Sequence, residues 1–403
     1  MTLAGAPQSV AHPRTAMPPL LLDLTHTSHT RARTGIQRVV RALHRELGAT
    51  ATAVTHDPYR GEWRPLEAWE LTNLSATDPS PTRGAHWPWT ARWRSRWHRF
   101  NTRAADLGLR GDYRGFLTAE GFSPAVAASL PDVFPRVAVF HDAIALRFPE
   151  LSPAGTVARF PGYLQELLRF DGIAAVSDES RESLLAYWRW LGVSNPPPVK
   201  TISLGVDLPP AADLPAAACA GTPVVLSVGT LEGRKNHLAL LEACELLWTR
   251  GEKFALHLVG SAHRQTGALA LAKLRALQLA GRPLRYDGPL PDAALDAAYA
   301  ACAFTVYPSL AEGFGLPVIE SLARGRPCVC SASGALGELS RGGGCLALAA
   351  VDATSLAAAI AQLLAAPATL AALSATARAR TFRSWSAYAA EVAAWIQELP
   401  RRG

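Results

Sequence analysis

Tyr307-Pro-Ser-Leu-Ala-Glu-Gly-Phe-Gly-Leu-Pro-Val-Ile-Glu320 is the stretch of sequence that decides the fold. The apolar segment 303–307 predicts a short strand that stops at Pro308, and a turn with two glycines follows it. From Leu316 the apolar spacing becomes helical, and Pro317 is acceptable in a first helical turn. Residues 327–331, Pro-Cys-Val-Cys-Ser, predict a second strand. The order strand, glycine turn, helix and strand indicates an α/β fold.

The glycine turn also predicts a ligand site. A glycine turn that leads into a helix start aims several free backbone N–H groups at one point, which suits an anion. Glu312 and Glu320 bracket this turn, and because carboxylates repel phosphate we expect them to accept hydrogen bonds from hydroxyls. Such a pair also occurs by chance, as a solvated turn residue and a solvated helix residue. The glycines between them and the flanking strands favour a ligand that is part phosphate and part sugar.

This stretch resembles the signature of the retaining glycosyltransferases of the GT-B fold, family 4 (glycosyl transferases group 1). That signature is E-G-F-G-x-P-x-x-E, then a small-residue helix, Gly-x-Pro, a strand and a later Glu. It stands here as residues 312–320, Gly325-Arg-Pro327 and Gly337-Glu338. The resemblance implies an α/β protein with two doubly wound, Rossmann-like domains that face each other across a cleft. It also implies a C-terminal helix that crosses back to the first domain.

The length of 403 residues suits two domains of this kind. We expect an N-terminal, acceptor-binding domain over 1–208 and a C-terminal, nucleotide-sugar-binding domain over 209–381. Residues 209–221 are rich in Pro and Ala and are the best linker in the chain. Residues 382–391 resemble the start of the family's crossing helix, which is expected over about 382–403.

Composition excludes several classes of protein. No run of about eighteen apolar residues lacks charge, which argues against a transmembrane helix. The start, Met1 to Pro19, has no apolar core of a secretory signal, and the six cysteines lack paired spacing, so we expect a cytoplasmic protein with small buried thiols. The net charge of +7 comes with scattered arginines and no nucleic-acid-reading motif. It therefore favours phosphate-bearing substrates or anionic lipid over nucleic acid.

Two strand ends in the first half carry candidate site residues. A buried strand at 19–25 leads through a polar loop to Gly35 and a helix over 36–47, with Arg31, Arg33 and Arg38 near the loop. The family's equivalent loop commonly has two glycines and lies against donor phosphate or acceptor, and only Gly35 matches here. The strand starting at Arg136 ends at His141-Asp142. A lone His is more often structural, but the carboxyl end of a strand favours a ligand role.

The second half carries a pair of cations ahead of a helix. The strand 223–229 is followed by Thr230-Leu-Glu-Gly-Arg-Lys-Asn236 and a helix from His237 to Trp248. Charged loops are usually solvated, but adjacent Arg234 and Lys235 near the positive end of a helix suit a diphosphate. The family has R-K-N at this place. Gly233 departs from it, since many relatives have Pro.

The resemblance implies a role for each candidate residue. His141 would contact the donor sugar near the reaction centre, Glu312 the hydroxyls of the donor sugar and Glu320 those of the ribose. Arg234, Lys235 and the backbone N–H groups of the turn would stabilise the leaving diphosphate, so the expected catalytic residues are His141, Glu312, Arg234 and Lys235. The expected donor-binding residues are Gly35, Gly313, Phe314, Gly315, Leu316 and Glu320. We see no aspartate-rich metal motif, and we expect no metal, no other cofactor and retention by front-face attack.

The donor and acceptor are less specific inferences. The His-Asp and Glu-x-Arg-Lys-Asn forms resemble mannosyl- and rhamnosyl-adding enzymes of bacterial surface polysaccharides, which makes GDP-mannose the first choice of nucleotide-sugar. A UDP-hexose, a dTDP- or GDP-deoxyhexose, or a non-catalytic relative that only binds a nucleotide-sugar are the alternatives. The acceptor would be a glycan or a polyprenyl-linked glycan. A GT-B phosphorylase would need a pyridoxal-binding lysine near the carboxyl end, and residues 321–403 contain no lysine.

Trp87 to Arg103 has the most unusual composition in the chain. Trp89, Trp93 and Trp97 recur every four residues, which gives one aromatic face if the segment is helical, and arginines form an adjacent basic face. A basic helix with tryptophans is typical of a segment that lies on an anionic membrane surface. The alternative is a helix whose tryptophans pack into the first domain while the arginines are solvated. Both hypotheses stay open at this point, and the first would place the protein at the inner face of the cytoplasmic membrane.

Overall fold

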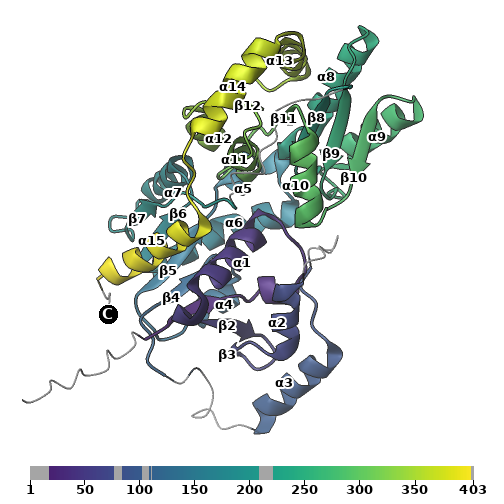
Figure 1. Cartoon of the computed structure of the whole chain (residues 1–403). Helices are drawn as coiled ribbons and strands as arrows, with labels where there is room; N and C mark the ends of the chain where they lie inside the picture. The colour runs from purple at the N-terminus through teal and green to yellow at the C-terminus, as the bar shows by residue number, and fades with distance from the viewer. Residues whose placement is uncertain (1–17, 77–83, 102–108, 110, 208–220, 401–403) are drawn as a thin grey trace, which may run out of the picture.

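The computed structural model describes residues 18–76, 84–101, 109, 111–207 and 221–400, and its two sheets divide the chain into two domains (Figure 1). The first sheet has seven strands in the order β3-β2-β1-β4-β5-β6-β7, parallel except for β3, which pairs antiparallel with β2. Its strands are β1 (Leu20–Asp23), β2 (Ala51–Asp57), β3 (Glu62–Pro65), β4 (Phe116–Thr118), β5 (Arg136–Phe140), β6 (Gly172–Ala175) and β7 (Val199–Thr201).

The second sheet has six strands, all parallel, in the order β10-β9-β8-β11-β12-β13. Its strands are β8 (Val224–Val228), β9 (Ala255–Val259), β10 (Leu284–Asp287), β11 (Phe304–Tyr307), β12 (Cys328–Ser331) and β13 (Cys345–Leu348). In both sheets the strand order reverses beside the first strand of the domain, which is the doubly wound topology expected from the sequence.

Helices connect the parallel strands. Those of the first domain are α1 (Gly35–Leu47), α2 (Ala68–Ser75), α3 (Trp89–Asn101), α4 (Pro124–Ala128), α5 (Ile144–Arg147), α6 (Ala154–Glu166) and α7 (Asp178–Trp190). Those that follow the second domain's strands are α8 (His237–Thr249), α9 (Ala268–Leu279), α10 (Asp292–Ala301), α11 (Leu316–Ala323), α12 (Gly334–Ser340), α13 (Ala353–Ala365), α14 (Pro367–Ala379) and α15 (Trp385–Glu398). No single helix of the described residues is long and apolar enough to cross a membrane, and α13 with α14 reaches that length only as a pair bent by 96°.

Both faces of the first sheet are covered by apolar side chains. Leu20 and Leu22 of β1 belong to one core cluster, and Leu21 between them belongs to another. Alternate residues of a strand point to opposite faces, so a continuous apolar run is what a strand buried on both faces requires.

The last helix, α15, returns to the first domain. Its residues Trp385, Tyr388 and Ile396 lie in the same core cluster as Leu20 of β1 and Val39 of α1, and Figure 1 shows α15 alongside α1 and the first sheet. A β-bridge between Val206 and Ser384 marks where the chain crosses back. The GT-B arrangement with a crossing helix, expected from the sequence, is therefore confirmed.

Some elements differ from the sequence-based expectation or went unpredicted. The apolar spacing of residues 160–170 predicts a helix there, and the helix in the structure, α6, begins earlier, at Ala154. Strands β2, β3 and β4 and helix α9 were not predicted. In β2 the reason is that Ala51–Asp57 mixes His, Asp and Thr with apolar residues and does not form an apolar run. The proposed boundary at 208/209, most of the linker and Arg103 lie outside the described residues.

Candidate active site

A cleft of about 800 Å³ lies between the two domains and is lined by residues of both. All but one of the predicted site residues line it. From the first domain these are Gly35 and His141, and from the second they are Arg234, Lys235, Glu312, Gly313, Phe314, Gly315 and Leu316. The exception is Glu320, which is buried beside the cleft. The carboxyl ends of the central strands of both sheets point toward this cleft, as expected for ligand sites of doubly wound sheets.

Glu312 is the centre of a buried charge cluster. Its carboxylate accepts hydrogen bonds from Arg234 Nη1 at 2.8 Å and from Lys235 Nζ at 2.5 Å. The hydroxyl of Tyr307 donates to Glu312 Oε1 at 3.0 Å, and Lys235 Nζ in turn donates to the Tyr307 oxygen. Glu232 also pairs with Arg234, at 2.9 Å. The pair of cations predicted in the Arg-Lys-Asn motif therefore meets the first glutamate of the signature in three dimensions.

The charges of this cluster set its protonation. Burial alone would raise the pKa of Glu312, but the neighbouring Arg234 and Lys235 outweigh burial and lower that pKa to about 2. Burial and the charge of Arg234 lower the pKa of Lys235, against the pull of Glu312. At neutral pH Glu312 is therefore an anion and a hydrogen-bond acceptor.

The local backbone explains why the cations lie here. Residues Gly233–Lys235 form a 3₁₀ turn that ends at Asn236, whose φ of 53° is left-handed. Asn tolerates this conformation better than most side chains, and Asn236 Nδ2 also donates to the Val351 carbonyl at 2.6 Å. Helix α8 starts directly afterwards, so both cations lie at its positive end.

His141 lies at the carboxyl end of β5, on the opposite wall of the cleft. Its Nε2 is 2.8 Å from the carbonyl oxygen of Ala119, and since a carbonyl only accepts, Nε2 carries the proton. Burial lowers the pKa of His141, so the imidazole is neutral at pH 7 with an unprotonated Nδ1.

The glycine turn of the signature docks on the first domain. The carbonyl of Gly313 accepts hydrogen bonds from Ser177 Oγ at 2.6 Å and from Ser180 Oγ at 3.2 Å. A Cβ atom on Gly313 would lie 2.0 Å from the His141 carbonyl oxygen, so only glycine fits. The adjacent Phe314 and Leu316 belong to the first domain's core cluster. The turn that would hold the donor is thus also one of the places where the two domains touch.

Glu320 lies elsewhere than the sequence suggested. Its side chain does not line the cleft. It is 3% exposed and forms an ion pair with Arg38 of α1. Its second oxygen accepts a hydrogen bond from the Tyr299 hydroxyl at 3.1 Å. Arg38 itself lines the cleft. Glu320, the residue predicted to bind the donor ribose, is therefore separated from the cleft by an arginine of the first domain.

Sequence reasoning missed several residues that organise the site. Glu338, the late glutamate of the signature, accepts hydrogen bonds from the backbone N–H groups of Asp178 and Glu179 at 3.1 and 2.6 Å, so it caps α7 of the other domain. Ser177 and Ser180 belong to a Ser-x-x-Ser pattern, which indicates a helix cap but not the partner found here. Arg38 was visible only as one of three arginines near a loop.

The part of the chain that the structure describes contains no cluster of side chains suited to bind a metal ion. No group of three or more His, Cys, Asp or Glu side chains is placed there to hold an ion. The expectation of a metal-independent reaction stays a prediction.

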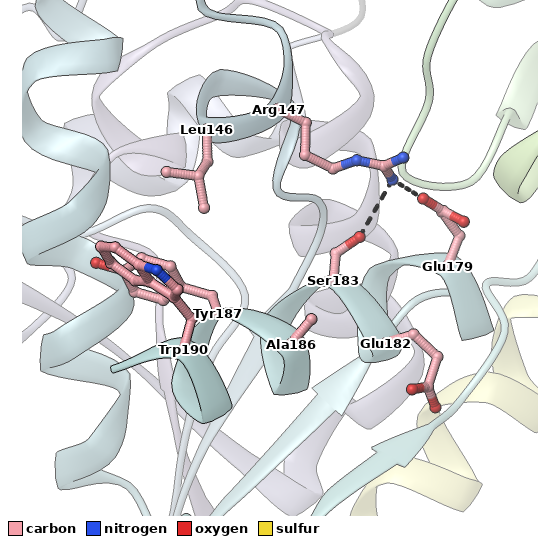
Figure 2. Close-up of a pocket in the computed structure, with 8 residues that line it drawn as sticks. All are labelled: Leu146, Arg147, Glu179, Glu182, Ser183, Ala186, Tyr187 and Trp190. Carbon is pink, nitrogen blue, oxygen red and sulfur yellow. Dashed lines mark hydrogen bonds and ion pairs between the residues drawn. The ribbon is translucent and has the colours of Figure 1, made fainter. Parts of the chain in front are cut away.

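A second, shallower hollow of about 580 Å³ lies between α5 and α7 (Figure 2). Leu146, Ala186, Tyr187 and Trp190 form its apolar part, and at one end Arg147 pairs with Glu179 and donates to Ser183 Oγ at 3.3 Å. None of the predicted site residues lies in this hollow.

Sequence comparisons find that this chain is similar to mannosyltransferases. WbdA, a serotype-specific mannosyltransferase of Escherichia coli, is 29% identical over 334 residues, which are 77% of this chain and 38% of WbdA. The O-antigen chain mannosyltransferase B of Escherichia coli is 32% identical over 204 residues, which are 48% of this chain and 52% of that protein. The chain thus spans less than two fifths of the length of WbdA and about half of the second relative.

Structural comparisons agree on the fold. Sucrose-phosphate synthase from Thermosynechococcus elongatus aligns with a TM-score of 0.67 at 21% identity, over 94% of this chain and 98% of that one. Anabaena HepE, solved with UDP and glucose, aligns with a TM-score of 0.65 at 16% identity, over 95% of this chain and all of that one. At these identities the likeness establishes the fold. Residues 222–366 match the family described as glycosyl transferases group 1, so the second domain of this GT-B fold contains a glycosyl transferases group 1 domain.

Proposed function

We propose that this protein is a retaining glycosyltransferase that moves a hexose, with mannose favoured, from a nucleotide-diphospho-sugar to a hydroxyl of a glycan or lipid-linked acceptor in bacterial surface polysaccharide synthesis. One observation supports it most. The ion-paired cluster of Arg234, Lys235 and Glu312 and His141 line one cleft between the two domains. Cations for a diphosphate and an ionised acceptor for sugar hydroxyls are what such a donor requires.

We propose a role for each group. Arg234 and Lys235 would neutralise the diphosphate as the bond between the sugar C1 and the phosphate oxygen breaks. Glu312, ionised at pH 7, would accept hydrogen bonds from the donor sugar. In front-face attack, the acceptor oxygen bonds to C1 on the side that the phosphate leaves, and its proton passes to the departing phosphate oxygen. His141 would accept a hydrogen bond from a sugar hydroxyl at Nδ1, because Nε2 already donates to the Ala119 carbonyl.

GDP-mannose is the donor we propose, because the two curated relatives named above are mannosyltransferases. A UDP-hexose and a dTDP- or GDP-deoxyhexose are the alternatives. We also propose that the protein works in the cytoplasm without metal or other cofactor, at the inner face of the cytoplasmic membrane, where a polyprenyl-linked acceptor would be available.

Calorimetric titration with GDP-, UDP-, dTDP- and ADP-sugars, with and without a chelator, tests the donor site. We expect one nucleotide-sugar to bind in both conditions and Lys235→Ala to weaken it by about tenfold to a hundredfold, since a charge-assisted contact is worth about 1.5–3 kcal/mol. Lys273→Ala is the matched control, because Lys273 pairs with Glu245 on α9 and α8, away from the cleft. NMR of the product would report the anomeric configuration.

Unchanged binding in Lys235→Ala would contradict the assigned site. Binding without transfer to any glycan or polyprenyl-linked acceptor would favour the non-catalytic alternative.

A further inference from the structure

Helix α3 exposes a row of large aromatic side chains. Trp89, Trp93, Trp97 and Phe100 are 73%, 68%, 69% and 86% exposed. Their spacing of four, four and three residues places them on one stripe of the helix. Large apolar side chains gathered on one exposed patch mark a binding surface far more often than scattered single ones do.

The opposite face of α3 is the one that packs on the first domain. Ala91 and Ser95 are 2% and 1% exposed, and Ser95 Oγ donates to the Asp57 carboxylate at 2.7 Å. Small side chains let the helix lie close to the domain, so the aromatic stripe points directly away from it. The alternative in which the tryptophans of α3 pack into the first domain is thereby wrong for this stripe.

Trp87, just before the helix, provides the internal contrast. It is 8% exposed, and its ring lies 4.1 Å from that of His29 and 5.6 Å from that of Trp69. The domain thus buries one tryptophan to anchor the start of α3 and leaves three others in solvent.

The aromatic stripe is flanked by positive charge. Arg92, Arg96 and Arg99 recur along one side of it and are exposed, and Trp89–Asn101 contains no acidic residue. None of these three arginines forms an ion pair within the described residues. Arg96 lies over the Tyr59 ring, 5.3 Å from its centroid, and Arg92 Nε donates to the Trp87 carbonyl. Their charges are therefore available to an anionic partner.

We propose that α3 binds the surface of an anionic lipid bilayer, with its aromatic stripe at the boundary of headgroups and acyl chains and its arginines on lipid phosphates. A continuous apolar stripe with cations beside it matches the layering of a bilayer, where Trp prefers the interface and Arg the phosphates. Figure 1 shows α3 beside β3 and α2, on the side of the first domain away from the second. This goes beyond the proposed transfer reaction and does not depend on it.

Co-sedimentation of the full chain with vesicles tests the proposal. We expect binding to phosphatidylcholine vesicles that contain phosphatidylglycerol, and much weaker binding to pure phosphatidylcholine or at high salt. Trp93→Ala with Trp97→Ala, and separately Arg92→Gln with Arg99→Gln, should each lower the partition coefficient on the order of tenfold.

Trp190→Ala is the matched control, because Trp190 is 78% exposed but lies on α7 beside the apolar hollow of Figure 2. It should bind vesicles as the unmodified protein does, and circular dichroism should show all variants folded. Equal binding of every variant, or no binding to anionic vesicles at low salt, would overturn the proposal. So would light scattering that shows a stable dimer which the α3 tryptophan changes dissolve, since the stripe would then join two copies.

Discussion

Glu312 both balances the charges of two neighbouring cations and is a candidate hydrogen-bond acceptor for the donor sugar. Its side chain is 7% exposed and would be costly to ionise without Arg234 and Lys235. Because these cations already face an anion in the protein itself, a donor diphosphate would join an existing cluster instead of creating an isolated cationic pocket.

Replacing Glu312 by Gln should destabilise the protein at pH 7 by about 1–3 kcal/mol, since the buried Lys235 loses its counter-charge and the partly exposed Arg234 loses one of two. The pKa of about 2 in the folded state lies below the ordinary value of 4.5. The stability from this carboxylate is therefore present above about pH 4.5 and is lost as the pH falls toward 2. Thermal unfolding between pH 7 and pH 3 measures this loss of stability.

The unmodified protein should lose more stability than Glu312→Gln over that range. Glu252→Gln is the control, because Glu252 is exposed and its loss should leave the pH dependence unchanged. Parallel curves for Glu312→Gln and the unmodified protein would contradict the assignment.

Arg38 forms an ion pair with Glu320, and this pair bears on how a donor could bind. If Glu320 binds the donor ribose, as the family resemblance implies, the donor has to displace Arg38 from it. We therefore predict that Arg38→Met lowers the free energy of unfolding by about 1–3 kcal/mol, since it leaves the buried Glu320 without a counter-charge. The same change should raise the affinity for the nucleotide-sugar.

A double-mutant cycle with Glu320→Gln measures the coupling of this pair, and titration calorimetry measures the affinity. A loss of affinity in Arg38→Met would mean that Arg38 itself holds the donor.

At the scale of elements, the turn before α11 fixes the spacing of the domains. Gly313→Ala would place a Cβ atom 2.0 Å from the His141 carbonyl oxygen and 3.0 Å from the Asp142 side chain. Both are rigidly held, so we expect the cleft to widen, transfer to fall by at least about tenfold and stability to fall by about 1–3 kcal/mol. Kinetic assays and thermal unfolding check both effects.

Gly162→Ala in α6 provides the control, because a Cβ there meets nothing within 4 Å and alanine favours a helix. Equal activity of the two alanine variants would show that the domains do not depend on this close approach.

The same elements show what local sequence can and cannot predict. The strand, turn and helix at 303–323 were predictable because apolar spacing and glycine placement are local signals. The partner of Glu320 was not, since Arg38 is far away in sequence and comes from the other domain. For α3 the spacing predicted a single aromatic face, but only packing through Ala91 and Ser95 shows which way it points.

At the scale of the whole molecule, helix α15 connects the end of the second domain to the core of the first. Trp395 of α15 is 6% exposed and lies in the core cluster of the first sheet, and a Cβ on Gly172 of β6 would lie 2.9 Å from its ring. We predict that Trp395→Ala lowers the free energy of unfolding by about 3–5 kcal/mol.

Hydrogen exchange should then locate the loss in β5 and β6 of the first domain, although the substitution follows the second domain in sequence. Trp190→Ala, at an exposed site, should change stability by no more than about 0.5 kcal/mol. Increased exchange confined to the second domain would contradict this account of α15.

The return of α15 bears on how the protein is made. The chain leaves the ribosome from its amino end, and domains generally begin to fold in that order. Here the first sheet lacks Trp385, Tyr388 and Ile396 of its own core until the second domain has been translated. The second domain, whose sheet ends at Leu348, is complete before the first one is. Of these two domains, the one that is synthesised first is finished second, and until α15 arrives the apolar side chains that α15 covers stay exposed.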